Sequence, residues 1–148
     1  MSGDHLDLLA SAVAGLPFVK NHGIELVEVA KGRAVARLPF NAAFATPPDL
    51  FPAAMVGMLG DIAAITACSA AVPPGAACST LDFTVKMTAP ARGSHLEAEG
   101  TALQAGATTA VGKADIFAVS PAGERTHCAV VLATGRMVGA NTKPSPKG

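Results

Sequence analysis

The stretch that decides the fold is residues 52–75, PAAMVGMLGDIAAITACSAAVPPG, in which nearly every side chain is apolar and small. Pro52 suits the first position of a helix, where a missing backbone N–H costs nothing. Pro73-Pro74-Gly75 ends such a helix, because proline cannot continue the helical hydrogen-bond ladder. The stretch therefore predicts one long helix over residues 52–72. Asp61, near its middle, is the only charged residue between Phe51 and Leu81.

A helix of about 20 apolar residues is long enough to cross a bilayer. A carboxylate near the middle of a membrane span is costly, and no basic residues flank either end of this segment. We therefore expect no membrane partner and a helix buried in the centre of a domain. A helix without a broad polar face must be enclosed on several sides.

The segments around this helix predict the structure that encloses it. Residues 4–15 predict a short amphipathic helix with Asp4 as its N-cap. From Thr80 to Thr88, apolar side chains alternate with polar ones, which is typical of a half-buried strand. The other predicted strands are 24–30 and 33–38 before the long helix, and 95–104, 108–119 and 125–137 after it.

Short turns between consecutive strands favour antiparallel pairing. The predicted class is therefore α+β, a long central helix wrapped by a curved antiparallel sheet. We expect a single domain over residues 1–138, followed by a flexible tail over residues 139–148.

The composition excludes several classes of function. In the 148 residues, 11 basic side chains balance 11 acidic ones, so no basic surface is expected for nucleic acid. The four histidines have no metal-ligand spacing, and we expect no metal site. Cys68, Cys78 and Cys128 are odd in number and form no C-x-x-C pair. We interpret them as free, mainly structural thiols in the reducing cytoplasm.

Asp61 is the strongest candidate for chemistry. Ala53, Gly57 and Asp61 are spaced four apart and share one helix face, on which a ligand or another chain could approach closely. A buried carboxylate needs a function or a partner, and a hydrogen bond to a strand or a dimer mate is an equal alternative. The free N–H groups near Ala53 and Ala54 could hold an oxyanion, although an ordinary solvated helix end is more common.

Residues 50–63 and 79–93 resemble the PaaI-like hotdog thioesterases. With Asp61 on the catalytic acid of that family, Pro52-Ala53-Ala54 stands where the family has His-Gly-Gly, and Thr46 stands on its Asn. Thr80-Leu81-Asp82-Phe83 is similar to the start of the next strand in the family, and Pro90-Ala91 to its closing turn.

The resemblance implies a hotdog fold and an acyl-CoA thioesterase for small or medium acyl or aryl-acyl groups, with coenzyme A in the substrate and no other cofactor. It implies that Asp61 is the general base or nucleophile and that the Ala53 N–H is the oxyanion donor. Ser79 or Thr80 would be a further catalytic residue that orients the water or the acid, and it would come from the facing protomer of a cytoplasmic homodimer, or of a dimer of dimers. The implied substrate-binding residues are Thr46, Pro52, Ala53, Ala54 and Gly57.

Two other functions remain open. The altered motif is compatible with a non-catalytic hotdog module that binds an acyl or aromatic ligand. A hydratase or dehydratase would need a catalytic His beside the acid, and no His lies near Asp61 in the sequence. That third alternative is the least favoured.

Overall fold

The computed structural model describes residues 2–139. The predicted tail therefore lies outside the described residues, except for Gly139, which ends the last strand. In chain order, the elements are α1 (Ser2–Ala14), α2 (Pro17–Asn21), β1 (Glu25–Ala30), β2 (Arg33–Pro39), α3 (Ala53–Ala70), β3 (Ala76–Met87), β4 (His95–Ala105), β5 (Thr109–Val119) and β6 (Arg125–Gly139).

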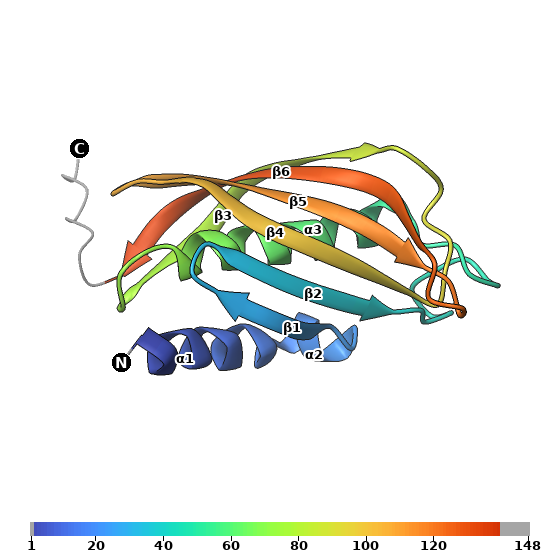
Figure 1. Ribbon diagram of the computed structural model, residues 1–148, viewed down its shortest axis with the longest axis horizontal. Helices are drawn as coiled ribbons and strands as arrows, with labels where there is room; N and C mark the ends of the chain where they lie inside the picture. The colour runs from blue at the N-terminus through green and yellow to red at the C-terminus, as the bar shows by residue number, and fades with distance from the viewer. Residues whose placement is uncertain (1, 140–148) are drawn as a thin grey trace.

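The six strands form one sheet in the order β1-β2-β4-β5-β6-β3, and all neighbours are antiparallel. Figure 1 shows the sheet curving over α3, with α1 and α2 beside β1. The predicted α+β class and its central helix wrapped by a curved sheet are confirmed. Although β3 and β4 follow each other in the chain, β3 pairs with β6 and lies at the sheet edge.

Small residues let α3 lie directly against the strands. Ala63, Ala64 and Ala67 on the helix are fully buried. A Cβ atom at Gly100 of β4 would overlap the Ala63 carbonyl, and one at Gly112 of β5 would lie 2.6 Å from the Ala64 carbonyl oxygen. The backbones of helix and strands therefore approach too closely for any side chain to stand between them.

The long helix is apolar enough to span a membrane by length and composition, yet 72% of its residues are buried inside the protein. The core helix of a globular domain has the same properties. The helix contacts all six strands of the sheet. This agrees with the expectation of an enclosed central helix.

The element ends differ from the sequence prediction at several places. Helix α1 begins at Ser2, so Asp4 lies in its first turn and is not the N-cap. Pro52 is the N-cap of α3 and not its first helical residue. A second, short helix, α2, begins at Pro17, since the fixed φ of proline suits a first turn. Strand β3 begins at Ala76, directly after a turn at Gly75 with φ +89°.

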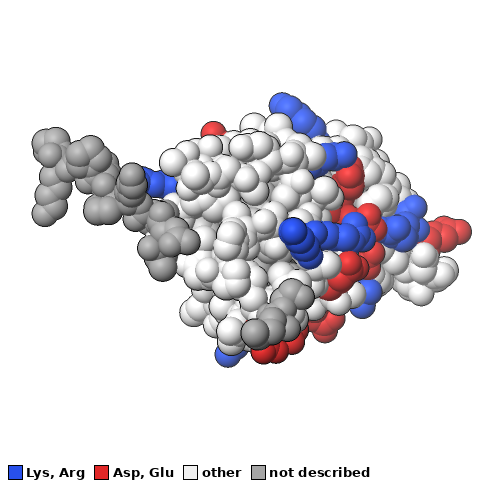
Figure 2. All heavy atoms as spheres, turned by 60° about the vertical axis from the view of Figure 1, so that its left-hand side comes forward, with Lys and Arg blue, Asp and Glu red and all other residues white. Residues whose placement is uncertain are grey.

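Charged side chains of both signs are mixed on the surface. Figure 2 shows basic and acidic groups interspersed in a band, while most of this face is uncharged. Arg125, for example, is paired with both Glu97 and Glu99, and Arg37 with Glu97. On this face there is no field of one sign that would attract a phosphate backbone.

The contact between β4 and α3 generates a test of the fold. Gly100→Ala should lower the free energy of unfolding by about 3 kcal/mol or more, because the added methyl meets helix backbone that cannot rotate away. Gly3→Ala is the control, since a Cβ there has no heavy atom within 4 Å and its effect should stay within about 1 kcal/mol. Urea unfolding would measure both, and equal midpoints for the two variants would contradict the close contact.

Candidate functional site

Asp61 lies in the middle of α3 and is half-buried against the start of β3. The Thr80 hydroxyl donates a hydrogen bond to Asp61 Oδ1 at 2.8 Å. The ladder between β3 and β6 has a bulge between Thr80 and Asp82, which changes the side-chain alternation just after this threonine. Thr80 therefore meets Asp61 of its own chain, whereas the resemblance had placed it on a facing protomer.

Burial raises the pKa of the Asp61 carboxyl above its ordinary value, and the hydrogen bond from Thr80 opposes this rise. Desolvation disfavours the charged form, while a donor to the carboxylate favours it. The result is a carboxylate that is more basic than an exposed aspartate, and the hydrogen bond from Thr80 to one of its oxygens fixes its orientation. Such a group can accept a proton from a water molecule or attack an electrophilic carbon.

Asp61 opens into a cavity of about 280 Å³ between α3, the start of β3 and the N-terminal helical segments. The walls combine apolar side chains with a few polar groups, a composition suited to an apolar ligand that carries one reactive polar group. The lining residues are Val13, Leu16, Phe18, Asp61, Ile62, Ile65, Thr66, Ser69, Cys78, Ser79 and Thr80.

The structure brings the three predicted catalytic residues, Asp61, Ser79 and Thr80, to this one cavity. It does not bring Thr46, Pro52, Ala53 or Ala54 there. Thr46 closes a loop through two backbone hydrogen bonds with Leu50.

Ala53 and Ala54 are exposed at the start of α3, and no hydrogen bond to their N–H groups is found within residues 2–139. Ala53 is eight residues from Asp61, which corresponds to about 12 Å along the helix axis. One thioester carbonyl cannot contact both groups of the same chain.

Gly57 was predicted to leave room for a ligand, but in the structure side chains of β3 occupy the space beside it. A Cβ atom at Gly57 would lie 2.7 Å from Val85 Cγ2 and 3.0 Å from Phe83 Cε2. Side chains of β3 therefore cover this part of the helix. Gly57 allows the edge strand to pack and does not line the cavity.

Most of the residues that line the Asp61 cavity were not predicted from the sequence. Ile62, Ile65 and Ser69 continue the Asp61 face toward the C-terminal end of α3, and helical spacing alone could have identified them. Val13 and Phe18 come from the N-terminal helical segments, whose contact with α3 has no local signal in the sequence.

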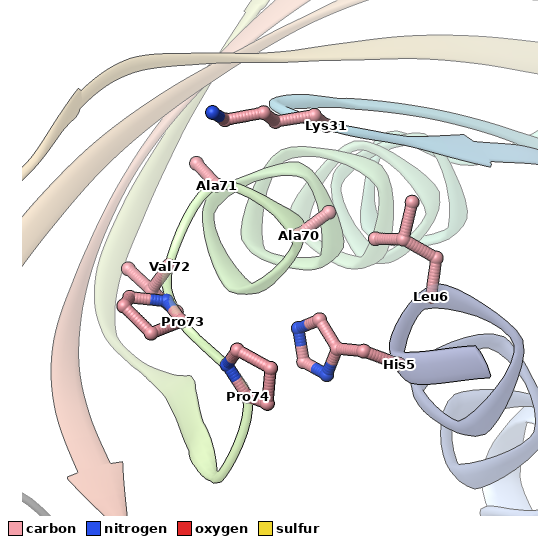
Figure 3. Close-up of a pocket in the computed structure, with 8 residues that line it drawn as sticks. All are labelled: His5, Leu6, Lys31, Ala70, Ala71, Val72, Pro73 and Pro74. Atoms are coloured by element: carbon pink, nitrogen blue, oxygen red, sulfur yellow. The ribbon is translucent and has the colours of Figure 1, made fainter. Parts of the chain in front are cut away.

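A second cavity of about 280 Å³ lies at the C-terminal end of α3. Figure 3 shows His5 and Leu6 of α1 and Lys31 facing Ala70 and Pro74 across it. Its lining residues include His5 and Lys31 but no carboxylate and no hydroxyl side chain. Within residues 2–139, no cluster of His, Cys, Asp or Glu side chains could hold a metal ion.

The fold of the chain can be compared with the folds of known proteins. No protein-family model and no curated protein sequence matches the chain. Its architecture is the hotdog fold, which it shares with solved structures of thioesterases. A thioesterase family protein from Silicibacter pomeroyi matches with a TM-score of 0.85 at 22% identity, covering 92% of this chain and 99% of that one.

Two further solved structures have the same architecture. The PaaI protein of E. coli, from the phenylacetic acid degradation operon, matches with a TM-score of 0.72 at 20% identity, covering 90% of this chain and 96% of that one. A thioesterase from Haemophilus influenzae matches with a TM-score of 0.74 at 19% identity and 90% coverage of both chains. The resemblance to PaaI-like hotdog proteins is thus confirmed at the level of the fold.

The raised pKa of Asp61 has a consequence for stability. A carboxyl whose folded-state pKa exceeds its unfolded-state value disfavours folding once it ionises, and this cost is absent below about pH 3.9. Asp61→Asn, which keeps an acceptor for Thr80, should therefore raise the free energy of unfolding at pH 7 by up to about 1 kcal/mol.

Urea unfolding at pH 7 and pH 3 would measure this effect, and the gain should shrink at the lower pH. Asp7→Asn is the matched control, because Asp7 is exposed on α1. A loss of stability in Asp61→Asn at pH 7 would show that the Asp61 charge is favourable in the fold and would contradict this account.

Proposed function

We propose that this protein hydrolyses the thioester bond of a small or medium acyl-CoA or aryl-acyl-CoA. The observation that carries the proposal is the half-buried Asp61 carboxylate, bound by the Thr80 hydroxyl at 2.8 Å in a largely apolar cavity. The fold shared with thioesterases from Silicibacter pomeroyi and Haemophilus influenzae supports the same class of reaction.

In this mechanism Thr80 binds one oxygen of Asp61, and the second oxygen faces the reacting carbon. Asp61 takes a proton from water, which attacks the thioester carbonyl, or attacks that carbon itself. A thiol is a far better leaving group than an alcohol because its pKa is only about 8.5. A strong general acid is therefore unnecessary, which suits a cavity lined by no histidine.

The oxyanion donor requires a second copy of the chain. The Ala53 N–H lies about 12 Å from Asp61 along α3, too far to share one substrate carbonyl. An antiparallel neighbouring α3 would place its Ala53 N–H beside Asp61 of the first chain. We therefore propose a homodimer in which each site combines Asp61 of one protomer with Ala53 of the other.

The edge strand β3 is the surface that supports this dimer. It is 12 residues long and has only one neighbour in the sheet, β6. Leu81 is 60% exposed, and Phe83 and Met87 are each 41% exposed. Asp82 and Lys86 are the two charged residues of this strand, and they carry opposite signs. A long free edge with exposed apolar side chains favours pairing with another chain.

Hydrolysis of an acyl-CoA panel, with short, medium, long and aromatic acyl groups, tests the activity through release of free thiol. The wild-type protein should turn over the short, medium or aromatic members. Asp61→Asn should lower kcat/KM by about 100-fold or more, since a positioned general base contributes 10²–10⁴-fold. Asp7→Asn should retain the wild-type rate.

A folded dimer that hydrolyses no member of the panel would refute the thioesterase. It would favour the alternative, a hotdog module that binds an acyl or aromatic ligand without chemistry. In that case, Asp61→Asn should leave ligand affinity nearly unchanged when measured by calorimetry.

The dimer has its own test. Leu81→Asp places a charge on the exposed edge strand and should convert the protein to monomers, with loss of hydrolysis because Ala53 of the partner is gone. Leu8→Asp, on the exposed surface of α1 where Leu8 is 70% exposed, is the matched control and should leave the mass unchanged. Light scattering after size-exclusion chromatography would measure both, and a monomeric, active wild-type protein would overturn the shared site.

A further inference from the structure

Cys68 and Cys78, ten residues apart in the sequence, come together where α3 ends and β3 begins. The turn at Pro73–Gly75 returns the chain along the helix it has just left. The backbone N–H of Cys78 then donates to Ser69 Oγ at 2.9 Å, next to Cys68. Both cysteines pack in one apolar cluster with Ala110 and Met137.

The strands beneath the two cysteines leave space for both sulfur atoms. A Cβ atom at Gly112 of β5 would lie 2.9 Å from Cys68 Sγ, and one at Gly135 of β6 would overlap Cys78 Sγ. Gly135 pairs with Ala110, two residues before Gly112 on the adjacent strand. The two sulfur atoms therefore occupy neighbouring positions over the same part of the β5–β6 ladder.

The two thiols also differ in pKa and in exposure. The hydrogen bond with Cys78, together with burial, raises the pKa of Cys68, which is fully buried. The same hydrogen bond lowers the pKa of Cys78. Cys78 is partly exposed and lines the Asp61 cavity, so small molecules can reach it. An accessible thiol of lowered pKa beside a second thiol is the arrangement of an attacking and a resolving cysteine.

We propose that Cys78 and Cys68 form a reversible dithiol–disulfide pair that reacts with low-molecular-weight disulfides such as oxidised glutathione. The Cys78 thiolate attacks one sulfur of that disulfide, the S–S bond breaks, and one glutathione leaves. Cys68 then attacks the Cys78 sulfur of the mixed disulfide, and its proton passes to the second departing glutathione.

In the net reaction, two cysteine thiols lose two electrons and two protons, and one oxidised glutathione becomes two reduced molecules. Intracellular disulfides of this kind are mostly catalytic or redox-sensing. Because Cys78 lines the Asp61 cavity, the oxidised and reduced proteins differ at the wall of the proposed substrate site. The pair itself does not depend on the proposed hydrolysis.

The test is to treat the purified protein with oxidised glutathione and measure intact mass and free thiols. The wild-type protein should lose two hydrogen atoms, keep Cys128 as its one free thiol of three, and yield a cross-linked peptide containing Cys68 and Cys78. Dithiothreitol should restore all three thiols. Cys68→Ala should stop at the intermediate and gain the mass of one glutathione on Cys78.

Cys128→Ala is the matched control, because Cys128 is fully buried and its thiol donates to the Ile116 carbonyl at 3.4 Å, outside the Cys68 cluster. This variant should form the same disulfide as the wild-type protein. A stable glutathione adduct on wild-type Cys78, or three unreacted thiols, would overturn the proposal. These measurements do not use hydrolysis, so an inactive protein that forms the disulfide would refute only the thioesterase.

Discussion

The close contact between the α3 backbone and the strands of the sheet is the constraint on which the rest of the structure depends. Gly100 and Gly112 bring β4 and β5 onto the carbonyl groups of Ala63 and Ala64, so the sheet must curve to follow the helix. Close packing of this kind excludes water from most of α3. Asp61 is the one charged residue of α3, and it faces the cavity between the start of β3 and the N-terminal helical segments.

Much of this architecture could be predicted because its signals are local. The apolar run of residues 52–72 has no polar face, and the alternation from Thr80 to Thr88 has the period of a strand. Few folds both enclose a central helix and join antiparallel strands by short turns. Asp61 could be selected for the same reason, since a single charge in an apolar helix requires a partner or a purpose.

The remainder depends on contacts between segments that are distant in the sequence. Nothing local indicates that β3 passes by β4 to pair with β6, or that the N-terminal helices cover the Asp61 cavity. Thr80 was selected through family resemblance, but its place on the same chain as Asp61 follows from the sheet order. The neighbouring positions of Cys68 and Cys78 also require the three-dimensional path of the turn between them. Residue chemistry could therefore select candidate groups, but it could not predict which of these groups meet.

The start of α3 differs from the His-Gly-Gly motif, yet it still offers the backbone N–H groups that the proposed mechanism uses. In the proposed mechanism, the helix contributes a backbone N–H, and any residue except proline provides one. Ala53 and Ala54 both have this group at the exposed helix end, and Pro52 stands just before it as the N-cap. Replacing glycine by alanine here adds a methyl that narrows the approach of a substrate without removing the donor. In the proposed mechanism, alanine at the two glycine positions would reduce the space for the acyl group while keeping the N–H that binds the oxyanion.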